Sequence, residues 1–292
     1  MKSYSYLFLF CLATFGISNV YSGPAFDKFT STKGKKLEEF GKQNLNSYSG
    51  HVFYPFGGPD VTFPLLMFPN LSTLTLVGLE PTEVPKSTTP ELDNAAWRNL
   101  ADLYNRSFFI TEQMASGLKN NVAVLILQQL VNLGATEINV SAIEGKDNAV
   151  QIECLYNGIK RTIRYYKASL DNKQIDQQFL ESLKPINVVL FKAASYLPHK
   201  DNFSNFQDFI FKNVEVIVQD STGIPFRKLK NNNWDITLHG QYEEPYKFPG
   251  ADKQTDYRDY SRSLNNQKLE FAFGYGFPFV PSNVLVAKKV SL

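Results

Sequence analysis

The sequence of 292 residues is poor in the side chains that bind metal ions and form covalent cross-links. It holds two cysteines, and Cys11 lies in the N-terminal segment that we expect to be removed on export, so Cys154 is left alone and zinc sites built on cysteine pairs are excluded. The three histidines, His51, His199 and His239, are far apart in sequence, and none belongs to a His-x-x-x-His pattern. We therefore expect no metal site and no resident cofactor.

An excess of charge of one sign is also lacking. The formal net charge is +2, and acidic and basic residues are interspersed, so no nucleic-acid partner is expected. After the first 22 residues, the longest apolar runs, 122–131 and 186–191, are too short to span a bilayer. We therefore expect no membrane span in the mature chain.

The N-terminus has the pattern of an export signal. Lys2 is followed by an apolar run over residues 6–17 and by a cleavage site after Ser22. The alternative is a retained membrane anchor, but this run is shorter than the roughly 20 residues that a span needs. We expect a signal peptide over 1–22 and a soluble protein of 23–292, located in the periplasm or outside the cell. Cys154 then remains without a partner, as a buried apolar residue.

Residues 23–292 alternate between strand-like and helix-like patterns, which is typical of a single α/β domain. Residues 51–56 and 74–79 are predicted to be parallel strands joined by a short helix at 61–68. Helical periodicity then dominates 91–133, with Asp93 as a cap. The sequence Asn157-Gly158 predicts a hairpin. The other predicted strands cover 138–143, 150–156, 159–166, 186–193, 214–218, 269–275 and 284–287, and the other predicted helices cover 173–183, 205–212 and 257–264.

This pattern predicts a three-layer Rossmann-like α/β sandwich with a mixed, partly parallel sheet. Its antiparallel strands are expected in the middle and C-terminal parts of the chain. The segment 241–255 is rich in Pro, Gly, Tyr and charge, and it is predicted to be a surface loop or a lid.

The strongest candidate for a binding site is a glycine turn followed by a carboxylate. Gly57, Gly58 and Asp60 come directly after the first predicted strand, and Glu80 ends the second. This arrangement resembles nucleotide- and S-adenosylmethionine-binding domains, in which an acidic residue about 20 positions after the glycines contacts a ribose. The sequence departs from that pattern in three ways. G-x-G-x-x-G is absent, Pro59 interrupts the turn, and Asp60 would place a negative charge where a phosphate should bind. A turn with a purely structural role is the alternative.

Four segments also carry a resemblance to a family. They are YPFGGPD at 54–60, VGLEP at 77–81, KAASYL at 192–197 and QDSTGIP at 219–225. Together they resemble an uncharacterised family of exported bacterial proteins for which no activity is known. The resemblance implies export and a shared fold, and it implies nothing about mechanism.

A second constellation follows two later predicted strands. Lys192 could bind a ligand, and a hydrolase would use Ser195 as nucleophile, His199 as base and Asp220 to orient the base. No G-x-S-x-G elbow supports a hydrolase, and Ser195 and Asp220 are equally suited to capping and turns.

Three functions therefore stay open: a domain that binds a small ligand in a crevice, a non-catalytic envelope or secreted interaction protein, and a hydrolase. The first and third require the strand ends at Phe56, Glu80, Lys192 and Asp220 to share one edge of the sheet. Glu80 is expected to be partly exposed there. The sequence does not identify the ligand, any partner or the oligomeric state.

Overall fold

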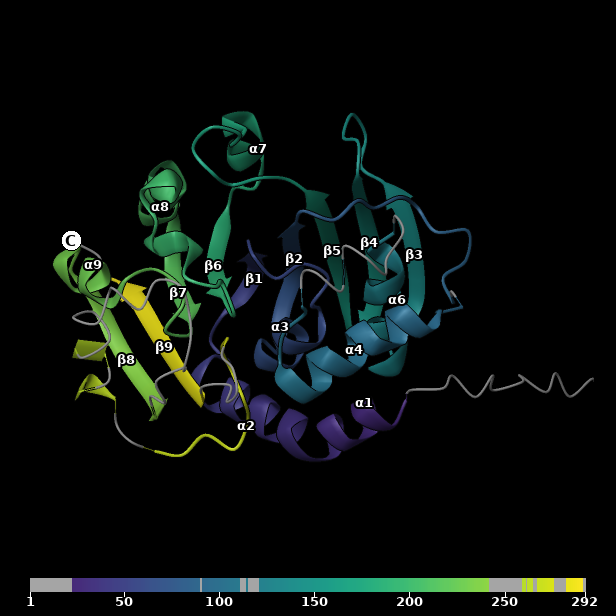
Figure 1. Ribbon diagram of the computed structural model, residues 1–292, viewed down its shortest axis with the longest axis horizontal. Helices are drawn as coiled ribbons and strands as arrows, with labels where there is room; N and C mark the ends of the chain where they lie inside the picture. The colour runs from purple at the N-terminus through teal and green to yellow at the C-terminus, as the bar shows by residue number, and fades with distance from the viewer. Residues whose placement is uncertain are drawn as a thin grey trace, which may run out of the picture.

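The computed structural model describes residues 23–89, 91–110, 114, 121–241, 259–260, 262–264, 267–275 and 282–290. Within these residues the chain forms one sheet of nine strands in the order β3-β4-β5-β2-β1-β6-β7-β9-β8, with helices on both faces (Figure 1). This architecture is the predicted Rossmann-like α/β sandwich with a mixed, partly parallel sheet.

The centre of the sheet is parallel. Its strands are β1 (Ser49–Tyr54), β2 (Asn70–Gly78), β5 (Ile159–Lys167), β6 (Ile186–Phe191) and β7 (Val214–Gln219). Both β6 and β7 are almost continuously apolar, as expected for strands that are covered on both faces. Because the chain leaves β1 toward β2 on one side and later adds β6 on the other, the strand order reverses at β1.

Antiparallel strands flank this centre. On one side, β3 (Thr136–Ala142) and β4 (Ala149–Tyr156) add to β5, and Asn157 and Gly158 form the predicted hairpin turn between β4 and β5. On the other side, β9 (Ser282–Lys289) runs between β7 and β8 (Trp234–Gln241) and is antiparallel to both.

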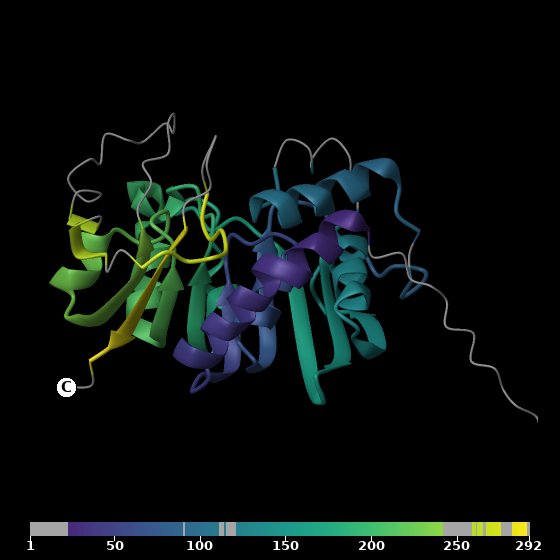
Figure 2. The ribbon, with the colours of Figure 1, turned by 90° about the horizontal axis from the view of Figure 1, so that it is seen from below.

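Helices cover the two faces as separate layers. One hydrophobic cluster joins the sheet to α1 (Pro24–Phe29), α2 (Lys35–Asn44), α3 (Thr62–Met67), α4 (Asn94–Arg106) and α6 (Ala123–Asn132). In Figure 2 the purple N-terminal helices cross in front of the strands. A second cluster packs α7 (Gln177–Ser182), α8 (Ser204–Asn213) and α9 (Phe226–Asn231) against the opposite face. Asp93 caps α4 as predicted, since its Oδ1 accepts hydrogen bonds from the backbone of Ala95 and Ala96.

Several predicted elements need correction. The segment 269–275 is not a strand, because its β-type pairing is a single bridge between Phe273 and Ser282. The helix predicted at 173–183 is confined to α7, and β8, α1 and α9 were not predicted. The signal peptide at 1–22, most of the loop at 241–255 and part of the helix at 257–264 lie outside the described residues. Among the helices that are described, none combines the length and the apolar character needed to cross a membrane.

Candidate functional site

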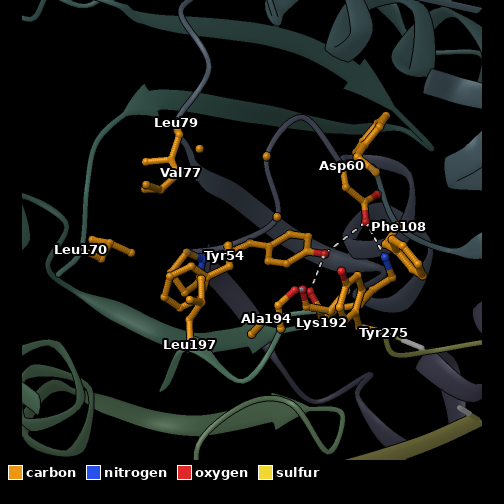
Figure 3. Close-up of a pocket in the computed structure, with 18 of the residues that line it drawn as sticks. Tyr54, Asp60, Val77, Leu79, Phe108, Leu170, Lys192, Ala194, Leu197 and Tyr275 are labelled. Carbon is orange, nitrogen blue, oxygen red and sulfur yellow. Dashed lines mark hydrogen bonds and ion pairs between the residues drawn. The ribbon is translucent and has the colours of Figure 1, made fainter. Parts of the chain in front are cut away.

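The carboxyl ends of the parallel strands enclose a cavity of about 660 Å³. Its walls include the segments after β1, β2, β5 and β6, with Phe56, Glu80 and Lys192 among the lining residues (Figure 3). Asp220, which follows β7, lies directly behind this wall and accepts a hydrogen bond from the Ala193 backbone. The predicted common edge is thus confirmed, and the cavity lies where the strand order reverses, the usual binding position in open α/β sheets.

A buried ion pair forms one wall of the cavity. Lys192 Nζ lies 2.9 Å from Asp60 Oδ2, and the two side chains are 1% and 2% exposed. Nζ also donates to the Ser107 carbonyl and lies 3.8 Å from the centre of the Phe63 ring. Burial lowers the pKa of Lys192, while the Asp60 carboxylate opposes that shift. The pair cancels its own charge, so it joins α3, the end of α4 and β6 without leaving a free ion in the wall.

The glycine turn accommodates a side chain of the protein. A Cβ at Gly57 would lie 2.4 Å from the Tyr54 ring, so the glycine makes room for that ring. The Tyr54 hydroxyl lies 3.2 Å from Asp60 Oδ2 and 3.3 Å from the Lys192 carbonyl. Gly58 has a φ of 54°, and its N–H donates to Val77 O at 3.3 Å. The turn therefore lacks the open row of N–H groups that a phosphate loop presents.

Glu80 is more buried than predicted. Only 9% of the residue is exposed, because it folds back onto its own turn, where Oε2 accepts from the Leu79 N–H at 3.1 Å. Oε1 accepts no hydrogen bond from any described residue, although Glu80 lines the cavity. Leu79, beside it in the cavity wall, is 64% exposed. The wall thus combines an available carboxylate oxygen with an exposed apolar side chain.

The loop after β6 has an unusual backbone. Ala193, Ser195 and Tyr196 have φ values of 54°, 52° and 58°, a left-handed region that non-glycine residues seldom adopt. The buried Asp220 fixes this loop, since its Oδ2 lies 2.6 Å from the Ala193 N. Burial raises the pKa of Asp220 to about 6, against hydrogen bonds from Thr222 and Ala193 that lower it. Left-handed residues of this kind cluster at functional sites.

The residues proposed for a hydrolase are not arranged as a catalytic triad. Ser195 lines the cavity, but its Oγ donates to the Ala193 carbonyl at 3.3 Å. The His199 ring is buried and packs edge-on against Tyr196, 5.4 Å between centres, outside the set of lining residues. The carboxylate of Asp220 accepts hydrogen bonds from Ala193 and Thr222 rather than from His199. The geometry gives a hydrolase no support.

Contacts that the sequence did not predict brace the cavity. Asn172, after β5, donates to the Asp201 carbonyl and to Ser204 Oγ, and accepts from Asn205 N. These contacts tie the β5 loop to the segment after β6, although β2 and β1 lie between the two strands. Phe108 and Tyr275 pack edge-on, 4.6 Å between centres, at the end of the cavity near Lys192 (Figure 3). No local signal predicts these contacts, because each joins distant parts of the chain.

In the described part of the chain, no group of three or more His, Cys, Asp or Glu side chains is placed to hold a metal ion. Cys154 is buried in β4 with a free thiol, and burial raises its pKa to about 11, as expected for a cysteine with a packing role. In comparisons with known proteins, no family model matches the sequence and no curated protein matches it either.

Proposed function

We propose that the protein binds a small organic ligand that carries vicinal hydroxyl groups, of the ribonucleoside type, in the cavity at the carboxyl edge of the sheet. The observation that carries this proposal is the Glu80 carboxylate, which lines a cavity at the reversal of strand order and whose Oε1 accepts no hydrogen bond from a described residue. A carboxylate at the end of the second strand is well placed to accept hydrogen bonds from ribose hydroxyls.

The size and lining of the cavity support the same proposal. A volume of about 660 Å³ lies within the range of small-molecule sites, roughly 300 to 1,000 Å³. Val77, Leu79, Leu170 and Leu197 form an apolar side of the cavity, on the left of Figure 3, whereas Asp60 and Lys192 lie to the right. An apolar wall beside a hydroxyl acceptor suits a ring attached to a sugar.

The convergence of the polar strand ends on one open cavity also favours ligand binding over a role confined to protein interactions. Several of these polar groups are satisfied internally, since Lys192 pairs with Asp60 and Asp220 accepts from Ala193 and Thr222. The preference for ligand binding therefore depends on Glu80, which lines the cavity. We propose binding and no reaction, since Ser195 Oγ, the nucleophile of the hydrolase hypothesis, donates to the Ala193 carbonyl and not to a base.

The test is calorimetric titration of the purified chain with adenosine, guanosine, cytidine and uridine, each beside its 2′,3′-dideoxy analogue. We expect at least one ribonucleoside to bind, and its dideoxy analogue to bind at least about tenfold more weakly, since the open carboxylate oxygen then lacks its donors. Equal affinity for a nucleoside and its dideoxy analogue, or no binding of any of them, would overturn the proposal.

A further inference from the structure

The wall of the cavity opposite Glu80 contains a backbone turn with several left-handed residues. Ala193, Ser195 and Tyr196 have positive φ values of 54°, 52° and 58°, and Ala194 does not. Successive N–H groups of a turn that point to one side form a concave site that binds anions. This turn is built without glycine, so its shape costs conformational free energy at each left-handed residue.

Two donors of this turn have no acceptor among the described residues. The Ala193 N–H is taken by Asp220, whereas the N–H groups of Ala194 and Ser195 donate to nothing within the part of the chain that the structure describes. Both residues line the cavity. Backbone donors in such a position need a partner from solvent or from a ligand, because an unpaired buried N–H is costly.

A cation lies on the same wall. Lys200 is exposed, lines the cavity, and forms no ion pair with any residue that the structure describes. The nearby lining carboxylate of Asp171 is engaged by Ser169 Oγ at 2.6 Å and by the Lys173 N–H at 2.9 Å. Arg106, also in the lining, is partly committed to Asp102 at 3.3 Å. Lys200 is therefore the cation best able to serve a ligand.

We infer that the N–H groups of Ala194 and Ser195, together with Lys200, form an anion subsite for a carboxylate or phosphate group of the ligand. This inference rests on the proposed function, and it narrows the ligand to an anionic compound with vicinal hydroxyls. It also gives Asp220 a role as a positioning residue, since Asp220 holds the first N–H of the turn away from the ligand.

The spacing of the two subsites fits such a ligand. Glu80 follows β2 and the turn follows β6, with β1 as the one strand between them. Two steps across a sheet cover about 10 Å. A ribose that carries an acidic group can fill this span once a hydrogen bond at each end is counted.

The first test uses the wild-type chain, labelled with nitrogen-15, and two probes: inorganic phosphate and acetate. We expect saturable shifts of the Ala194 and Ser195 amide signals with at least one anion, and no shift at the remote turn residue Gly145. The anion that saturates at lower concentration identifies the acidic group. Uniform small shifts across the protein, or none at these two amides with either anion, would overturn the inference.

The second test compares a ribonucleoside with its 5′-monophosphate and with its 5′-carboxylate. The wild type should bind one of the two anions about tenfold or more tightly than the nucleoside, and Lys200→Glu should abolish this preference. Lys160→Glu makes the same charge change at the start of β5, on the opposite edge of the sheet, and should preserve it.

The two proposals fail separately in these experiments. If nucleosides bind with no gain from either anion, the anion subsite is wrong and the ligand site stands. If phosphate or acetate shifts the two amides while no nucleoside binds, the subsite stands and the vicinal-hydroxyl ligand is wrong.

Discussion

At the scale of single residues, the cavity depends on a few buried polar groups whose partners are close in space and distant in sequence. Lys192 and Asp60 are separated by 132 positions, and the sequence named both as candidate ligand contacts. It could not show that they pair with each other, since nothing local links them. Glu80 was predicted at the correct strand end but with too much exposure, because the return of its side chain to the Leu79 N–H is a tertiary detail.

The first prediction concerns the ion pair. Lys192→Met leaves a buried carboxylate without its cation, so we expect the free energy of unfolding to fall by about 3–5 kcal/mol. The double variant Lys192→Met/Asp60→Leu removes both charges and should recover a large part of the loss. Guanidinium unfolding measures both variants. A loss below about 1 kcal/mol for the single variant would contradict the pairing.

The second prediction concerns the titration of Asp220. Its folded pKa of about 6 lies above the unfolded value of about 3.9, so the folded state binds the proton more tightly. The stability that this proton contributes is fully present below about pH 4 and is lost as the pH rises through about 6. Asp220→Asn does not titrate. Urea unfolding should therefore show that the free energy of unfolding of the variant rises relative to that of the wild type between pH 4 and pH 7. A constant difference over this range would show that Asp220 keeps an ordinary pKa.

At the scale of elements, local chemistry was informative where periodicity and turn residues agree. The parallel strands around β1, the cap at Asp93 and the hairpin at Asn157-Gly158 all follow from short-range patterns. The segment 269–275 has alternating aromatic residues, and yet it makes one β-bridge, because those rings serve packing rather than a ladder. For example, Phe271 packs against Phe40 of α2 at 5.5 Å between ring centres. Alternation alone does not distinguish these two uses.

The third prediction tests the hairpin turn. Gly158 has a φ of 74°, and a Cβ added there would meet no atom within 4 Å. Gly158→Ala should therefore lower the free energy of unfolding by about 1 kcal/mol through backbone strain alone. Asn157 has a φ of 50°, which glycine also tolerates. Asn157→Gly should therefore change the free energy of unfolding by less than about 0.5 kcal/mol. Chemical denaturation measures both variants. Equal stability of Gly158→Ala and wild type would contradict the predicted backbone strain at position 158.

At the scale of the whole molecule, the fold class and the edge that carries the cavity could be predicted, because parallel order forces strand ends together. Helix α1, which packs on one face of the sheet, and the edge strand β8 were not predicted. Their sequences are amphipathic and polar, and tertiary packing decides their structure more than local preference does. The contacts of Asn172 beside the cavity and of Phe108 with Tyr275 in its wall were not predicted for the same reason.

The fourth prediction concerns export. If residues 1–22 are a signal peptide, the protein recovered from the periplasm or the medium should begin at Gly23, and N-terminal sequencing measures this directly. An intact Met1 on the exported protein would show that residues 1–22 are a retained membrane anchor and not a signal peptide.

The account as a whole rests on Glu80 as the acceptor for ligand hydroxyls, and Glu80→Gln tests it most directly. The glutamine keeps an oxygen for the Leu79 N–H, so the free energy of unfolding should stay within about 1 kcal/mol of wild type. The decisive measurement is the calorimetric affinity of this variant for the ribonucleoside that binds wild type best. We predict a loss of about tenfold or more with the fold intact; unchanged affinity in a stable variant would contradict the central claim.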